Sequence, residues 1–148
     1  MKPLVITIFG LSLLFTFSLY AQTSADKEAV SQTCMKYIEG FYEGDESKLR
    51  SALSEELNKF GFWKQENGNF GDAIHMSYQG AMDFAKNVRE NEEYPPTDSP
   101  KIVEVMDLKE HIAAAKVTAW WGEDYLLLSK RSGNWKIEQV IWEGPLTK

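Results

Sequence analysis

The sequence is poor in the residues that disulfides and metal sites require. Its 148 residues include one cysteine, Cys34, and two histidines, His75 and His111. A single thiol cannot form an intramolecular disulfide, and these three residues lack the spacing of a zinc site. The sequence also has no glycine-rich phosphate loop and no Gly-x-Ser-x-Gly turn. We therefore expect no metal and no cofactor.

An excess of positive charge is also missing. The chain has 16 Lys and Arg residues against 22 Asp and Glu residues, which gives a formal net charge of −6. Nucleic acids and anionic lipid surfaces are bound by basic faces, so neither is an expected partner. Five prolines and 13% aromatic residues argue against a disordered chain. The length and composition predict one globular domain.

The N-terminus has the layout of a secretory signal peptide. Lys2 precedes an uncharged run, Leu4–Tyr20, after which a small alanine is followed by polar residues. We expect residues 1–21 to be a signal peptide and residues 22–148 to form one domain of a secreted or periplasmic protein without membrane contact. The uncharged run is close to the shortest that can span a bilayer, so an uncleaved anchor is the alternative interpretation.

Three segments have the spacing of amphipathic helices. The first is Ser24–Tyr42, where apolar residues recur every three or four positions, and Cys34 on this stripe is expected to be a core residue. A short second helix follows Asp45 and a third follows Ser77, because both residues can cap a helix. Gly44 can end the first helix. The expected buried stripes are Val30, Cys34, Tyr37, Ile38 and Phe41, then Leu49, Ala52 and Leu53, then Tyr78, Ala81, Met82, Ala85 and Val88.

The remaining chain has the alternation of β-strands. From Leu57 the period is two, and Asn67-Gly68 predicts the turn of a hairpin whose second arm spans residues 70–76. Four further strands are expected at Lys101–Leu108, Ile112–Trp121, Tyr125–Arg131 and Trp135–Trp142. One face of the second of these is apolar and small, with Ala113, Ala115, Val117, Ala119 and Trp121. The predicted fold is α+β: a curved, mainly antiparallel sheet wrapped around three helices.

Two stretches carry a family resemblance. GFYEGDESKLRSAL, at residues 40–53, and VTAWWGEDYLLLSKRSGNWKIEQVIW, at residues 117–142, resemble the "Putative lumazine-binding" family of the nuclear transport factor 2-like superfamily. The resemblance implies a cystatin-like cone with a pocket at its wide end. Many relatives have His-Pro where this chain has Ser54-Glu55, and a histidine where it has Leu127. A function carried by those histidines is therefore not expected here.

The superfamily includes ketosteroid isomerases and polyketide cyclases, so the resemblance raises acid–base catalysis as a hypothesis. The candidate catalytic residues are Asp72, His75 and Tyr37, although Asp72 and His75 lie on opposite faces of a regular strand. His111, beside a predicted turn, is expected to be solvated. Aromatic residues are the stronger signal, since ligand pockets are mostly apolar. The expected ligand-binding residues are Tyr37, Phe41, Trp63, His75, Phe84 and Trp121.

Three hypotheses of function follow. The first is an exported domain that binds a small flat or apolar ligand in an aromatic-lined pocket. The second is an acid–base enzyme of the isomerase or cyclase type. The third is an interaction module with a vestigial pocket. Contiguous apolar surface marks interfaces, and superfamily members commonly pair through the sheet, so we also expect a homodimer through the outer sheet face at Trp120, Tyr125 and Leu127.

Overall fold

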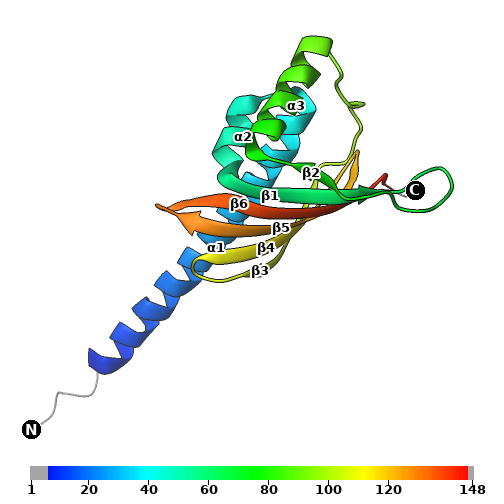
Figure 1. Ribbon diagram of the computed structural model, residues 1–148. Coiled ribbons are helices and arrows are strands. Elements are labelled where there is room, and N and C mark those ends of the chain that lie inside the picture. The colour runs from blue at the N-terminus through cyan, green and yellow to red at the C-terminus, as the bar shows by residue number, and fades with distance from the viewer. Residues whose placement is uncertain (1–6, 147–148) are drawn as a thin grey trace, which may run out of the picture.

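The computed structural model describes residues 7–146, in which three helices and six strands follow one another along the chain. The helices are α1 (Thr7–Glu43), α2 (Glu46–Ala52) and α3 (Tyr78–Asn91), and the strands are β1 (Leu53–Trp63), β2 (Ile74–Met76), β3 (Ile102–Leu108), β4 (Ile112–Ala119), β5 (Gly122–Arg131) and β6 (Asn134–Gly144). Figure 1 shows α2, α3 and the C-terminal part of α1 together on one side of the curved sheet, while the N-terminal part of α1 extends past it.

The six strands form one sheet in the order β2-β1-β6-β5-β4-β3. The pairs β1–β2, β3–β4, β4–β5 and β5–β6 are antiparallel, and β1–β6 is parallel. The predicted α+β class, with a curved and mainly antiparallel sheet around helices, is confirmed. The parallel pairing joins the N-terminal hairpin to the C-terminal meander, so residues far apart in sequence become neighbours in the sheet.

The helices cover the face of β4 that the sequence predicts. Ala113, Ala115, Val117 and Ala119 are buried, and these small side chains allow the helices to approach the sheet closely. The same face of β5 contributes Leu126 and Leu128, which are 1% and 2% exposed. Side chains alternate between the two faces of a strand, so Tyr125 and Leu127 lie on the outer face.

The junction between α1 and α2 depends on a glycine. Gly44 has φ +65°, a conformation that L side chains rarely adopt, and a Cβ there would lie 2.6 Å from the carbonyl oxygen of Ala85 in α3. Asp45 then caps α2, because its Oδ1 accepts hydrogen bonds from the backbone N–H groups of Ser47 and Lys48 at 2.8 and 3.1 Å. The close approach of α3 and the cap together fix the direction in which α2 leaves.

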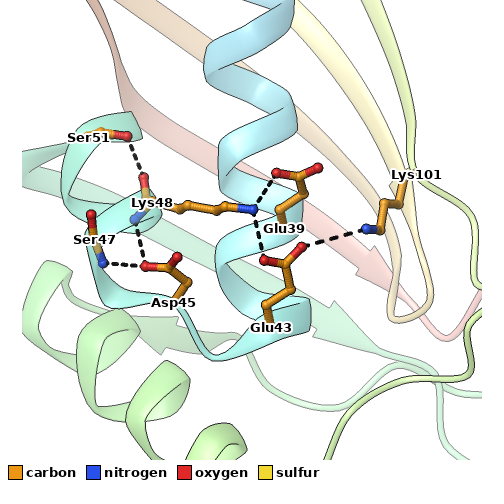
Figure 2. A network of polar contacts seen from close by, with 7 residues as sticks. All are labelled: Glu39, Glu43, Asp45, Ser47, Lys48, Ser51 and Lys101. Atoms are coloured by element: carbon orange, nitrogen blue, oxygen red, sulfur yellow. Dashed lines mark hydrogen bonds and ion pairs between the residues drawn. The ribbon is translucent and has the colours of Figure 1, made fainter.

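Ion pairs reinforce this junction, as Figure 2 shows. The Lys48 ammonium contacts Glu39 at 2.7 Å and Glu43 at 2.8 Å, so α2 is tied to the last turns of α1. Lys101, just before β3, lies 4.0 Å from the other oxygen of Glu43. Each pair is partly exposed and contributes little alone. The network holds the end of α1, which carries Phe41 into the site described below.

Two boundaries differ from the sequence prediction. Strand β1 begins at Leu53, directly after α2, and not at Leu57. Trp120 and Trp121, predicted as strand residues, form the connection between β4 and β5, where Ala119 pairs with Gly122. Tyr42 fixes this turn: its hydroxyl oxygen accepts a hydrogen bond from the Trp120 N–H at 2.8 Å. The same hydroxyl donates to the carbonyl oxygen of residue 100 at 2.6 Å.

The predicted signal peptide, residues 1–21, is only partly included in the residues that the structure describes. Residues 1–6 of the expected signal peptide lie outside the described residues, and α1 begins at Thr7. Within residues 7–146, no helix is both long enough and apolar enough to cross a bilayer.

Candidate functional site

A pocket of about 160 Å³ lies where α1 and α3 meet the β4–β5 turn and the ends of β1 and β6. An engineered apolar cavity of about 150 Å³ is large enough for benzene, so this pocket has room for one aromatic ring, with its open side free for more. Seven of its side chains are apolar and one is charged: Phe41, Lys59, Trp63, Met76, Phe84, Trp120, Trp121 and Trp142.

The aromatic walls of the pocket hold one another in place. The Phe41 ring makes edge contacts with Phe84 at 5.6 Å and with Trp121 at 5.7 Å between centroids. Trp63 and Trp142, which also line the pocket, make a similar contact at 6.4 Å between centroids. Pairs of this geometry are favourable beyond the area they bury. The walls are therefore largely formed before any ligand arrives.

Trp142 reaches the pocket because its partner in β1 is a glycine. Gly61 and Trp142 lie opposite each other in the parallel β1–β6 pair. A Cβ on Gly61 would lie 2.2 Å from the indole ring, so any side chain there would displace it. The indole consequently covers the strand next to Lys59, whose Nζ lies 5.5 Å from the ring centroid.

The floor of the pocket is a buried polar cluster. Lys59 Nζ donates to the Tyr37 hydroxyl at 2.7 Å and lies 3.3 Å from Asp124 Oδ2. The Tyr37 hydroxyl in turn donates to Asp124 Oδ2. Trp121 Nε1–H donates to Asp124 Oδ1 at 2.7 Å. Asp124 is fully buried. Its carboxylate accepts hydrogen bonds from three donors, which lie on α1, β1 and the β4–β5 turn.

Burial changes the proton affinities of this cluster. Burial lowers the pKa of Lys59 from its ordinary value, and the charge of Asp124 opposes that change. Burial raises the pKa of Tyr37 well above 10, and the neighbouring Asp124 charge raises it further. Tyr37 therefore remains a hydrogen-bond donor. The Lys59 ammonium also faces the rings of Tyr37 and Phe41 at 5.4 and 5.9 Å, which favours the cation.

The candidate residues from the sequence fall into three groups: residues that line the pocket, one residue beneath it, and two residues that do not reach it. Phe41, Trp63, Phe84 and Trp121 line the pocket. Tyr37 is fully buried beneath it and contacts the lining residue Lys59.

His75 and Asp72 do not reach the pocket. In β2 it is Met76, opposite Lys59, that faces inward, so His75 opposite Phe60 lies on the other face of the sheet. Its ring packs on Phe60 at 5.6 Å between centroids. Asp72 is exposed and precedes β2. The structure therefore does not bring the candidate acid–base residues Asp72 and His75 together with Tyr37, because the alternation of the short strand directs the histidine outward.

Sequence reasoning also misplaced Trp120 and missed Lys59 and Asp124. Trp120 lines the pocket mouth in the β4–β5 turn and does not lie on the outer sheet face as predicted. Lys59 is an even number of residues from Leu57 and Trp63, so the three side chains lie on the same face of β1. Asp124 likewise shares the parity of two buried leucines in β5. Strand alternation was thus the signal that could have found both charged residues.

The remaining reactive residues lie elsewhere. Cys34 is buried in the core, where burial raises the pKa of its thiol to about 12. His111 is exposed beside the β3–β4 turn. In the part of the chain that the structure describes, no group of three or more His, Cys, Asp or Glu side chains could hold a metal ion.

Known structures of the same shape define the fold class. A nuclear transport factor 2-like protein from Silicibacter pomeroyi superimposes with a TM-score of 0.61 at 15% identity, covering 81% of this chain and 96% of that one. A similar protein from Shewanella baltica gives 0.61 at 21% identity, covering 80% and 93%. A domain with a cystatin-like fold from Nostoc punctiforme gives 0.57 at 15% identity, covering 84% and 80%. The fold is therefore the nuclear transport factor 2-like cone.

The family is defined more closely by sequence. The family model described as "Putative lumazine-binding" matches residues 25–143, which is most of the chain, and the protein belongs to this family. A search of curated proteins found no match.

Proposed function

We propose that the protein binds a small, flat and largely apolar molecule in the aromatic pocket at the end of its sheet. The observation that carries the proposal is an open pocket of about 160 Å³ that is lined by seven apolar side chains and one charged side chain. Small-molecule sites have this character: an apolar, preformed cavity with a few polar groups that orient the ligand. The family description refers to lumazine binding, which agrees with a small-molecule ligand.

The open pocket favours binding over the two alternatives. A vestigial pocket would be filled by its own side chains. An acid–base enzyme would need a carboxylate free to take a proton from its substrate. Asp124, the carboxylate beneath this pocket, already accepts bonds from Tyr37, Lys59 and Trp121. Binding without catalysis is therefore the function that the site supports best.

Tryptophan fluorescence tests the proposal, with naphthalene as the probe. Naphthalene should quench the fluorescence of the pocket tryptophans and saturate. Phe84→Ala should weaken its binding by about 1–3 kcal/mol through lost contact area. Tyr94→Ala is the matched control, because Tyr94 is an exposed aromatic residue outside the pocket. The absence of saturable quenching both by naphthalene and by the ketone 1-indanone, or equal affinities of the two folded variants, would contradict the proposal.

The proposed setting of this function is outside the cytoplasm, with residues 1–21 removed as a signal peptide. Asp26 supports a domain that begins shortly after the expected cleavage, because it ties α1 to the sheet through Lys130 at 2.6 Å and Trp135 at 3.2 Å. N-terminal sequencing of the exported protein should begin within about two residues of Gln22. Intact Met1 in a membrane fraction would instead identify an anchor.

A homodimer through the outer sheet face is also proposed. Tyr125, Leu127 and Ile141 are 54%, 53% and 41% exposed, and Tyr125 pairs directly with Ile141 across β5 and β6. Contiguous apolar surface of this kind marks interaction sites. A two-fold dimer needs one self-complementary patch, and the exposed apolar residues of this face are the candidate for it.

A further inference from the structure

We propose that the ligand is uncharged and carries a carbonyl oxygen, which accepts a hydrogen bond from the Lys59 ammonium at the pocket floor. This inference rests on the proposed binding function and specifies the chemical class of the ligand. Planar conjugated ketones, lactams and imides belong to this class.

The Lys59 ammonium has more N–H donors than the hydrogen bonds it makes among the described residues. An ammonium group has three N–H donors. Among the described residues, the hydrogen bonds of Nζ go to the Tyr37 hydroxyl and Asp124 Oδ2. Nζ also lies over the ring faces of Phe41 and Trp142, at 5.9 and 5.5 Å from their centroids, and these rings offer no oxygen or nitrogen acceptor. Lys59 lines the pocket, so the pocket is where a third acceptor can stand.

A ligand that fills the pocket changes the surroundings of this third donor. Water in the open pocket can satisfy the third donor, and a ligand that enters must displace that water. A ligand without an acceptor would leave a charged donor unsatisfied, which is unfavourable in a buried place. A ligand with a carbonyl oxygen replaces the lost bond. The pocket therefore discriminates against plain hydrocarbons of the same shape.

The charges at the pocket floor favour an uncharged ligand. Asp124 Oδ2 lies 3.3 Å from Lys59 Nζ, so the positive charge of the floor already has its counterion. Tyr37 and Trp121 hold the carboxylate from two further sides, and it cannot turn away. An anionic ligand on the same ammonium would be repelled by Asp124 at low dielectric constant. A carbonyl oxygen accepts the hydrogen bond without adding a second negative charge.

The exposed fractions of the lining residues indicate how the ligand is oriented in the pocket. Lys59 and Phe41 are 6% and 5% exposed and form the closed end. Trp63, Phe84 and Trp120 are 37%, 40% and 44% exposed and form the mouth. The carbonyl end consequently enters first, and the rest of the ring system lies between the aromatic residues of the mouth.

Three probes with one bicyclic skeleton test the inference on the intact protein. They are 1-indanone, indane and indane-1-carboxylate, titrated by tryptophan fluorescence. We expect 1-indanone to bind at least about tenfold more tightly than indane, as for a hydrogen bond to a charged group. It should also bind more tightly than the carboxylate. In Lys59→Met, 1-indanone and indane should bind equally. Lys64→Met, an exposed lysine directly after β1, is the control that retains the preference.

Each result that differs from these expectations overturns a different claim. Equal binding of 1-indanone and indane to the unaltered protein overturns this inference and leaves the proposed binding function intact. Tightest binding of the carboxylate overturns the claim that the ligand is uncharged. A preference for 1-indanone that survives in Lys59→Met overturns the assignment of Lys59. Binding of none of the three probes overturns both proposals. If Lys59→Met does not fold, the variant Lys59→Met/Asp124→Asn removes both buried charges and takes its place.

Discussion

The buried pair of Lys59 and Asp124 makes the protein sensitive to the loss of one partner. Asp124→Ala would leave the Lys59 ammonium buried without its counterion, and we expect the free energy of unfolding to fall by about 3–5 kcal/mol. Urea denaturation measures this loss. The control is Glu123→Ala, because Glu123 is partly exposed and its ion pair with Lys116 contributes little. A loss in Asp124→Ala no greater than in the control would contradict the prediction.

The thiol of Cys34 provides a prediction of pH dependence. Burial raises its pKa from 9.0 to about 12 in the folded protein. The stability that comes from keeping the thiol neutral is fully present below pH 9.0 and is lost as the pH rises toward 12. The loss reaches about 1.4 kcal/mol per pH unit.

The comparison with Cys34→Ala measures this contribution together with the coupling of the thiolate to Tyr37, because the charge of Cys34 also raises the pKa of Tyr37. The free energy of unfolding of the variant should fall less steeply with pH above 9.0 than that of the unaltered protein. The variant is expected to be less stable at every pH because it leaves a small cavity, so the slopes are compared and not the absolute values. Parallel pH profiles would show that the thiol does not ionise differently in the folded and unfolded chains.

Individual site residues were predictable from the sequence to different degrees. Phe41 and Trp121 could be predicted as pocket residues, because they are aromatic and lie where the family resemblance implies a pocket. The inward direction of Lys59 and Asp124 follows from strand parity, but their pairing does not. They meet because β1 and β5 flank β6, where Lys59 is opposite Val140 and Asp124 opposite Trp142. The parallel β1–β6 pairing leaves no local pattern in the sequence.

At the scale of elements, the N-cap of α2 is the most direct test of how the helices are fixed. Asp45→Ala removes the acceptor for two backbone N–H groups, and we expect a loss of about 1 kcal/mol in the free energy of unfolding. Asp45→Asn should lose much less, because asparagine is an equally good cap. Urea denaturation of both variants makes the comparison. An equal loss in both would assign the effect to the charge of Asp45 and not to capping.

Element boundaries could be predicted where a local residue sets them. Gly44 and Ser77 set helix ends through backbone conformation and capping, and the structure confirms both. The turn at Trp120 and Trp121 could not be predicted, because two apolar residues continue the strand pattern and neither is a turn residue. Tyr42, from a distant helix, holds that turn through the Trp120 N–H. The second arm of the first hairpin also shortens to Ile74–Met76.

At the scale of the whole molecule, the outer sheet face gives the last prediction. Leu127 is 53% exposed and lies opposite Ala114 on β4 and Gln139 on β6, at the centre of the proposed interface. Sedimentation at micromolar concentration should give about twice the mass of the monomer. Leu127→Glu should give a folded monomer, because a buried and unpaired carboxylate is unfavourable by several kcal/mol.

The matched control for this interface is Tyr94→Glu, which introduces the same charge at an exposed aromatic residue in the loop before β3. This variant should remain a dimer, since Tyr94 is not on the sheet. A dimer that persists in Leu127→Glu would move the interface to another surface, and a monomeric unaltered protein would end the proposal. Because the strand residues that line the pocket, such as Lys59 and Trp142, lie on the other face of the sheet, naphthalene should bind the Leu127→Glu monomer as tightly as the unaltered protein.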